Sequence, residues 1–197
     1  MEEYSLVYVD DGPDAALSRY LDKGFQSSEY KIRYSEIVFK PEDGYESLLS
    51  DVRIQSANII IIDSWLFQNR TVTGGKFTGE EFMLILKKLF PFIEVIVITQ
   101  NGIDSEIRKI AKYDGNKKET AAEYYARVLH GVIDDATNSI RQFRLLADMV
   151  NNNGIWETVL KEEVIDTLAG KNTYNLTTTD IDNLISAFKK IQEGING

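Results

Sequence analysis

The sequence lacks cysteine entirely and contains a single histidine, His130, among its 197 residues. Disulfides and thiolate metal sites are therefore excluded, and zinc sites or catalytic triads built on histidine are strongly disfavoured. Long hydrophobic runs are also missing, since no apolar stretch approaches the ~20 residues that a membrane span needs. The metal chemistry that these absences leave open is a hard cation held by oxygen atoms.

Positive charge is scarce as well, with 22 Lys and Arg against 31 Asp and Glu and a net charge of -9. This balance argues against non-specific binding to nucleic acid, which depends on basic residues that neutralise phosphates. The acidic first residues, MEEYSLVYVDD, show neither the basic region nor the cleavage site of a secretory signal. We therefore expect a cytoplasmic protein that binds neither DNA nor membranes.

The stretch ANIIIIDSW, residues 57–65, is the strongest structural signal in the chain. Its four consecutive isoleucines are β-branched and form an unbroken apolar run, which is typical of a strand covered on both faces of a parallel sheet. Asp63 follows at the carboxyl end of this strand, where ligands bind in open α/β sheets. An acid in this place can also be a turn former or a helix cap, so the neighbouring segments must decide.

Strand and helix patterns alternate on both sides of the isoleucine run. The strands are predicted at 6–9, 32–39, 59–62 and 94–99, and the helices at 13–24, 45–52 and 78–90. This βαβαβ order predicts a doubly wound α/β fold with a parallel sheet of four or five strands.

The alternation ends after the fourth strand. A short helix is predicted from Ser105 to Lys112, and from Glu119 to Val150 apolar residues recur every three or four positions, which predicts one long helix. The alternative is a fifth strand at Tyr124 to Leu129 that leads into a shorter helix. The long helix is favoured because its period runs through that stretch without a break.

Three parts are thus expected: an α/β domain at 1–118, the long helix at 119–150, which would replace strand five and helix five, and a helical extension at 151–197. The extension holds two amphipathic stretches, 155–168 and 179–191, and its seven acids against four lysines make it a poor reader of DNA. The apolar stripe of the long helix exceeds what short strands can cover. We therefore predict a homodimer through this region.

Acidic residues end two of the predicted strands. Strands one and three lie side by side in a parallel sheet with right-handed crossovers, so Asp10, Asp11 and Asp63 should meet in one crevice, with the Thr99 hydroxyl on the next strand. Clustered carboxylates raise one another's pKa unless a cation lies among them. Carboxylate, carbonyl and water oxygens suit magnesium, so the sequence predicts a Mg²⁺ site.

The region from Leu6 to Ile103 resembles the receiver domains of two-component response regulators. The resemblance rests on VYVDD, IIIIDSW, the "G-x-E" helix TGEEFMLILKKLFP and VIVIT, in this order. It implies a CheY-like (flavodoxin-like) fold with sheet order 2-1-3-4-5. It also implies a signalling role rather than an enzymatic one, with a sensor histidine kinase or a phosphotransfer protein as partner.

The resemblance assigns roles to five residues. Asp63 would accept a phosphoryl group from a phosphohistidine, and Thr99 would bond the phosphoryl oxygens. Asp10, Asp11 and Asp63 would hold Mg²⁺ together with the backbone carbonyl of Trp65. Phosphorylation would then add about -1.5 to -2 charges and reshape the adjoining surface.

One part of the receiver pattern is missing: a Lys, usually followed by Pro, at the end of a fifth strand. If residues 124–129 form that strand, Arg127 is the nearest cation. Otherwise the candidates are Lys112, or Arg70 and Lys76 in the connection after Asp63. That connection spans 79 - 63 = 16 positions up to Gly79, longer than is usual in the family, and could act as a lid.

Two other functions remain open at this stage. A degenerate pseudo-receiver would keep the fold and act as a phosphorylation-independent protein interaction module. A hydrolase with Asp63 as nucleophile is less favoured, because the sequence shows no DxD pattern at a strand end and no evident general acid. His130 is expected to be an ordinary packing or surface residue rather than a relay histidine.

Overall fold

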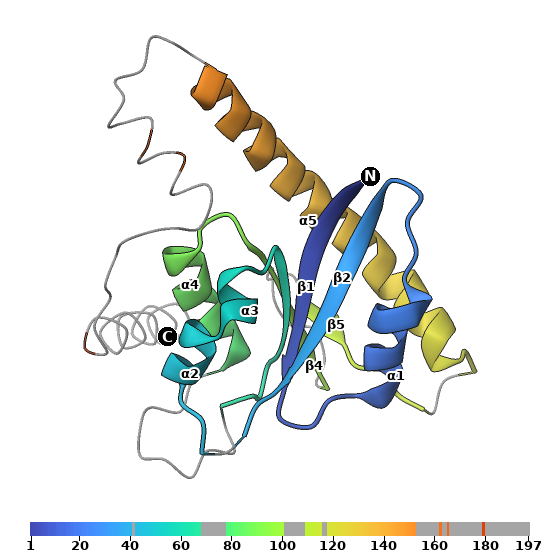
Figure 1. Ribbon diagram of the computed structural model, residues 1–197. Coiled ribbons are helices and arrows are strands. Elements are labelled where there is room, and N and C mark those ends of the chain that lie inside the picture. Colours follow the sequence, from blue (N-terminus) through green and yellow to red (C-terminus); the bar gives the residue numbers. More distant parts are fainter. Residues whose placement is uncertain are drawn as a thin grey trace, which may run out of the picture.

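The computed structural model describes residues 1–40, 42–67, 78–100, 109–115 and 118–152, together with Glu162, Ile165 and Thr179. Five strands form one parallel sheet in the order β2-β1-β3-β4-β5. The strands are β1 (Glu2–Asp10), β2 (Tyr30–Val38), β3 (Ile59–Asp63), β4 (Glu94–Thr99) and β5 (Lys109–Ala111). The helices are α1 (Ala15–Arg19), the π-helical η1 (Tyr20–Gly24), α2 (Tyr45–Ser50), α3 (Val52–Gln55), α4 (Gly79–Leu89) and α5 (Ala121–Asn152) (Figure 1). The predicted parallel α/β class is confirmed.

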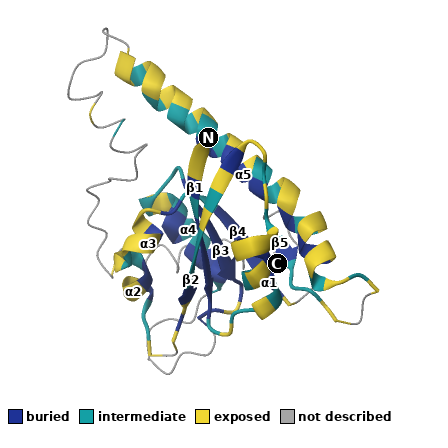
Figure 2. Cartoon of the chain, turned by 45° about the vertical axis from the view of Figure 1, so that its right-hand side comes forward, coloured by how far each residue is buried: buried dark blue, intermediate teal, exposed yellow. Residues whose placement is uncertain are grey.

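Helices cover both faces of the sheet, so the central strands are buried on each side (Figure 2). Ile60 and Ile62 pack towards α2, α3 and α4, whereas Ile59 and Ile61 pack towards α1, η1 and α5. Successive side chains of a strand point to opposite faces, and here both faces are apolar. This arrangement explains why the isoleucine run is unbroken rather than alternating.

Helix α4 begins with a capping box at Thr78. The Thr78 hydroxyl accepts a hydrogen bond from the Glu81 amide, and the Glu81 carboxylate accepts one from the Thr78 amide. The next residue, Gly79, lies against the end of β3, where an added Cβ would be 2.4 Å from the carbonyl oxygen of Asp63. Only glycine allows this close approach of two backbones.

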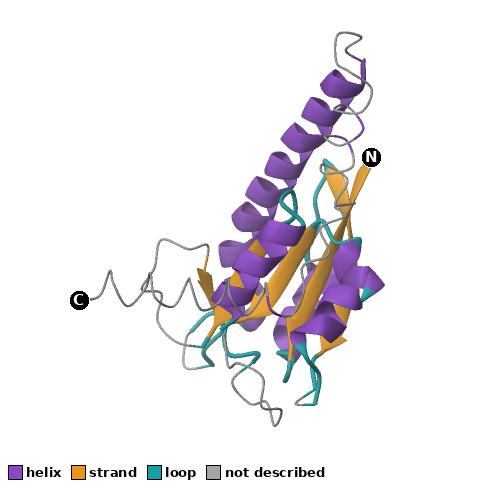
Figure 3. Cartoon of the chain, turned by 90° about the vertical axis from the view of Figure 1, so that its left-hand side faces the viewer, coloured by secondary structure: helices purple, strands orange, loops and turns teal. Residues whose placement is uncertain are grey.

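Helix α5 runs without interruption for 32 residues, which confirms the predicted long helix. The alternative strand at Tyr124 to Leu129 is therefore wrong. Helix α5 packs on the sheet as far as Ile140, and its C-terminal end extends past the sheet (Figure 3). Within the ranges described above, no helix combines the length and the apolar character needed to cross a bilayer.

Two local predictions are wrong. Lys109–Ala111, predicted as the end of a helix, form strand β5, which pairs in parallel with Val97–Thr99. Three residues are too few to show a period, and the neighbouring strand rather than local preference decides their conformation. The predicted helix at 45–52 is divided at Asp51, whose side chain accepts a hydrogen bond from the Arg53 amide and caps α3.

The long helix follows β5 and does not replace a fifth strand. Several other predictions fall outside the described residues: residues 105–108, the two cations Arg70 and Lys76 in the connection after Asp63, and the C-terminal helices at 155–168 and 179–191 apart from Ile165, Glu162 and Thr179.

Candidate acidic site at the carboxyl edge of the sheet

Three neighbouring strands end in polar side chains at one edge of the sheet. Asp10 is the last residue of β1, Asp63 of β3 and Thr99 of β4. The register pairs Val9 with Ile62, so Asp10 and Asp63 occupy equivalent positions at the ends of adjacent strands. Oxygens of Asp10, Asp11 and Asp63 all lie within 4.8 Å of one another. The structure thus brings together the three acids that the sequence placed in one crevice.

A lysine lies between the acids. The Lys112 ammonium is 2.8 Å from Asp10 Oδ2 and 2.7 Å from Asp63 Oδ1, and the Lys112 side chain is only 9% exposed. Lys112 follows β5 directly, and its backbone amide donates to the carbonyl of Thr99 at 2.7 Å, which prolongs the strand pairing. Of the four candidate cations, Lys112 is the one that the described residues place here, because Arg127 pairs with Glu119 on the surface.

The ionisation of this cluster is strongly coupled. Burial raises the pKa of Asp63, the charge of Asp10 adds to this, and the hydrogen bond and charge of Lys112 oppose it without cancelling it. Burial alone would lower the pKa of Lys112, but its hydrogen bonds to Asp10 and Asp63 outweigh burial and leave the pKa raised. One ammonium therefore stays charged at neutral pH and only partly compensates the acids around it.

Hydrogen bonds fix Asp10 and connect it to α5. Asp10 Oδ2 accepts from the Tyr8 hydroxyl, and Oδ1 accepts from the Gly12 amide at 2.9 Å. The Tyr8 hydroxyl in turn accepts from the Asp14 amide at 3.3 Å, and Asp14 Oδ2 accepts from the Tyr125 hydroxyl of α5 at 2.8 Å. Burial and the bond to Asp10 raise the pKa of Tyr8, so the phenol remains a neutral donor.

The turn after β3 holds the second acid. The Trp65 amide donates to Asp63 Oδ2 at 2.7 Å, while Asp63 Oδ1 faces Lys112. The Ser64 amide donates to the carbonyl of Ile98 at 2.8 Å, which keeps the turn against β4. Both oxygens of Asp63 therefore have defined directions, and the Trp65 side chain, which is about half exposed, lies next to the acid in sequence and marks the site for spectroscopy.

The donor set suits a hard divalent cation. All three acids offer carboxylate oxygens, and these oxygens lie close together at the edge of the sheet. Mg²⁺ is usually bound by one or two carboxylates and completes its shell with water and substrate oxygens. Asp10, Asp11 and Asp63 are the residues of this cluster whose carboxylate oxygens would hold such an ion, and the carbonyl of Trp65 is the ligand that the receiver resemblance adds.

A second polar cluster beside the acids was missed at the level of sequence. The Ser64 hydroxyl lies 2.8 Å from both carboxylate oxygens of Glu80, and the Lys109 ammonium lies 2.5 Å from Glu80 Oε1. Glu80 lies in the first turn of α4, where a negative charge also favours the start of a helix. No sequence signal pointed to Lys109, because its strand was not recognised.

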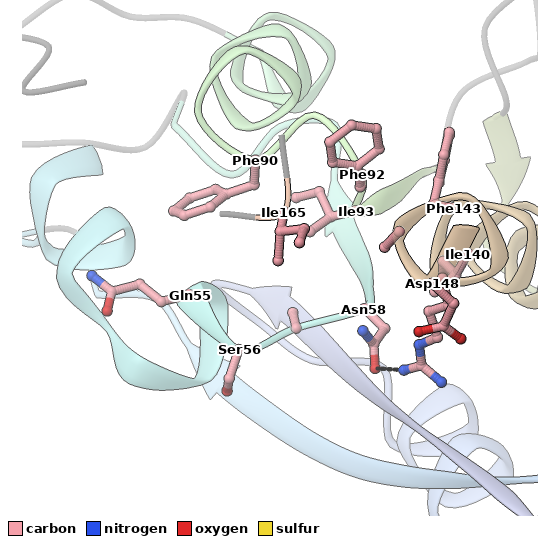
Figure 4. Close-up of a pocket in the computed structure, with 13 residues that line it drawn as sticks. Gln55, Ser56, Asn58, Phe90, Phe92, Ile93, Ile140, Phe143, Asp148 and Ile165 are labelled. Carbon is pink, nitrogen blue, oxygen red and sulfur yellow. Dashed lines mark hydrogen bonds between the residues drawn. The ribbon is translucent and has the colours of Figure 1, made fainter. Parts of the chain in front are cut away.

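A cavity of about 340 Å³ lies at the opposite edge of the sheet, between the residues that precede β3 and β4 and the second half of α5 (Figure 4). Phe90, Phe92, Ile140, Phe143 and Ile165 line much of it. At its polar side Arg144 donates to Asn58 Oδ1 at 3.4 Å and lies over the Tyr4 ring. None of the sequence-predicted site residues reaches this cavity.

Neither a protein-family model nor a curated protein matches the chain. The functional interpretation therefore rests on the sequence motifs and on the geometry of the acidic site.

Proposed function

We propose that the protein is an atypical cytoplasmic response-regulator receiver that accepts a phosphoryl group on Asp63 and signals through protein contacts. The observation that carries this proposal is the Lys112 ammonium between Asp10 and Asp63, at the end of the fifth strand. A lysine in that place was the part of the receiver pattern that the sequence did not show. With Thr99 at the end of β4, each polar residue type of the pattern has a counterpart at one edge of the sheet.

The proposed reaction is a phosphoryl transfer. A carboxylate oxygen of Asp63 forms a bond to the phosphorus of a donor phosphohistidine while the P–N bond breaks, and the imidazole leaves with the electron pair and takes up a proton. Such transfers depend mainly on positioning and on neutralisation of charge. Lys112 supplies a positive charge at Asp63 Oδ1, and Mg²⁺, held as described above, would supply more at the transferred oxygens.

The phosphoryl group would change the balance of charge around Lys112. It brings about -1.5 to -2 charges and further acceptor oxygens, which compete with Asp10 for the ammonium and draw in the Thr99 hydroxyl. Asp10 is linked to α5 through Tyr8, Asp14 and Tyr125. A shift at Asp10 would therefore be felt at the start of α5, and we expect α5 to take part in the output.

Phosphorylation should be observed directly with a small phosphodonor. In the presence of Mg²⁺ and acetyl phosphate, we expect the intact protein to gain the mass of one phosphoryl group, because Asp63 is ionisable, oriented and flanked by Lys112. The Asp63→Asn variant should gain none, and chelation of Mg²⁺ should slow the reaction strongly. Asp51→Asn, which changes an acid that caps α3, is the matched control and should react normally.

Beryllofluoride with Mg²⁺ should also change the fluorescence of Trp65 in a Trp156→Phe background, since Trp65 is joined to Asp63 through its amide. A wild-type protein that neither gains mass nor responds to beryllofluoride would refute the proposal. That result would favour the second candidate, a pseudo-receiver that binds partners without phosphorylation. The pairing of Asp10 and Asp63 with Lys112 is compatible with such a module, because it compensates the acids without any ligand.

We further propose a homodimer through the second half of α5. Leu145, Leu146 and Met149 lie in this half of the helix, and all three side chains are exposed in the described part of the chain. Light scattering at micromolar concentration should give twice the mass of the chain, and Leu145→Glu with Met149→Glu should give a monomer with unchanged circular dichroism. Val52→Glu, at an equally exposed apolar residue of α3, should remain dimeric. A monodisperse wild-type monomer would exclude this interface.

A further inference from the structure

Ser64, Glu80 and Lys109 form a polar cluster beside the acids, and its members come from three different segments. Ser64 follows Asp63, Glu80 lies in the first turn of α4, and Lys109 is the first residue of β5. The Glu80 carboxylate accepts from the Ser64 hydroxyl at 2.8 Å and pairs with the Lys109 ammonium at 2.5 Å. Glu80 and Ser64 are buried and Lys109 is mostly so. Through these contacts, the loop that follows β3 is connected to both α4 and β5.

The position of strand β5 depends on such side-chain contacts. It has only three residues and pairs with Val97–Thr99 of β4. Short strands gain few ladder hydrogen bonds, so their position depends on side-chain contacts. On the face towards α5, the Tyr124 hydroxyl donates to the Ala111 carbonyl and Ile110 is buried. On the face towards α4, the bond from Lys109 to Glu80 is the ion pair that holds β5 in the described part of the chain.

We propose that Glu80 and Lys109 are positioning residues for Lys112, and that their ion pair holds β5 against α4 so that the Lys112 ammonium reaches both Asp10 and Asp63. Lys112 lies three residues after Lys109, and its amide is the last to pair with β4, through the Thr99 carbonyl at 2.7 Å. Movement of β5 away from α4 would withdraw Lys112 from the acids. The role for phosphorylation rests on the proposed function, whereas the structural role does not.

The pair of Glu80 and Lys109 is a strong contact because both side chains are charged. Burial alone would raise the pKa of Glu80, but the hydrogen bonds from Lys109 and Ser64 outweigh burial and lower the pKa, so Glu80 stays ionised near neutral pH. Neutralising one partner leaves the other as an unpaired charge in a buried place, which is strongly unfavourable. We expect the remaining charged side chain to move towards water, and β5, which is short, to move with it.

Hydrogen exchange tests the structural role without metal or phosphodonor. In Glu80→Gln the amide of Lys112 should exchange at least about tenfold faster than in the wild type, the change expected when a hydrogen bond to a charged group is lost. The amide of Ile96, in the middle of β4, should keep its rate. Glu94→Gln changes an acid that pairs with Lys87 at the far end of α4, and it should leave the Lys112 amide unaffected.

Ser64→Ala provides a milder variant in case Glu80→Gln folds poorly, because it removes one donor to Glu80 and keeps the ion pair. It should give an intermediate acceleration at Lys112. If the Lys112 amide exchanges at the wild-type rate in both variants, or if Glu94→Gln accelerates it equally, the positioning role is overturned. Acceleration in Glu80→Gln alone, or graded across the two variants, supports it.

Phosphorylation tests the consequence separately. Glu80→Gln should slow transfer from acetyl phosphate to Asp63 by at least about tenfold, the factor that one lost charge-assisted hydrogen bond implies. The single variant Lys109→Arg keeps the positive charge opposite Glu80 and should therefore retain most of the wild-type rate. A wild type that is not phosphorylated refutes the proposed function, and the exchange result then decides the positioning role alone. Normal phosphorylation of Glu80→Gln would overturn the role in transfer even if β5 is loosened.

Discussion

Replacing Lys112 with methionine is expected to lower the free energy of unfolding by about 3–5 kcal/mol in a solution that chelates metals. Asp10 and Asp63 are only 1% and 5% exposed, and Lys112 is the cation that the described structure places within hydrogen-bonding distance of both. Without it, two buried carboxylates face each other, and one must take up a proton or open to water. Urea denaturation at pH 7, where the raised pKa of Lys112 leaves it fully protonated in the wild type, measures the loss.

The same variant should respond more strongly to Mg²⁺ than the wild type does. A divalent ion bound among Asp10, Asp11 and Asp63, as proposed, would supply the positive charge that the variant lacks, so Mg²⁺ should restore a large part of the lost stability. Lys23→Met removes an ammonium that is 80% exposed and should change neither stability nor the response to Mg²⁺. Equal stabilities of Lys112→Met and the wild type would show that the ammonium does not occupy the position described.

Replacing Gly79 with alanine is expected to destabilise the protein by about 1–3 kcal/mol, as overpacking of a close contact usually does. The new Cβ would lie 2.4 Å from the carbonyl oxygen of Asp63 and 3.1 Å from the Cα of Ser64. Both neighbours are backbone atoms at the end of a buried strand, so no side chain can turn away to make room. Helix α4 or the turn that carries Asp63 must move instead.

Gly131→Ala is the matched control for this substitution. Gly131 lies within α5, and nothing is found within 4 Å of its added Cβ. Alanine there should stabilise the protein by about 0.5–1 kcal/mol, because it favours the helix and crowds no neighbour. Thermal unfolding followed by circular dichroism compares the two. If Gly79→Ala were as stable as the wild type, the close approach of α4 to β3 would be wrong.

Displacement of Asp63 in Gly79→Ala should also weaken the acidic site, since the carbonyl that meets the new methyl group belongs to the proposed acceptor itself. This effect explains why a glycine follows the cap Thr78 in a helix that otherwise contains strong helix formers. The glycine of the "G-x-E" motif is thus required by packing, while its Glu81 completes the capping box. The Glu81 carboxylate accepts its described hydrogen bond from the Thr78 amide rather than facing the acids.

Much of the architecture could be predicted because local patterns and tertiary structure agree there. The unbroken, β-branched isoleucine run is typical of a strand buried on both faces, and α5 shows a helical period over its whole length. The meeting of Asp10, Asp11 and Asp63 followed from strand order, since adjacent parallel strands deliver their carboxyl ends to one edge. These inferences needed a repeated signal over many residues or a general rule of topology.

The sequence by itself thus determined a parallel α/β sheet, a long helix and an acidic edge, because the spacing of apolar residues along the chain shows which faces of its strands and helices are buried. Only the tertiary structure decided which cation faces the acids and what holds it there. Lys112 is brought to them by a strand of three residues, and the partner of Lys109 is an acid 29 positions earlier in the chain, 109 - 80. Contacts of this kind depend on where segments meet in space, and no local pattern of residues encodes that meeting.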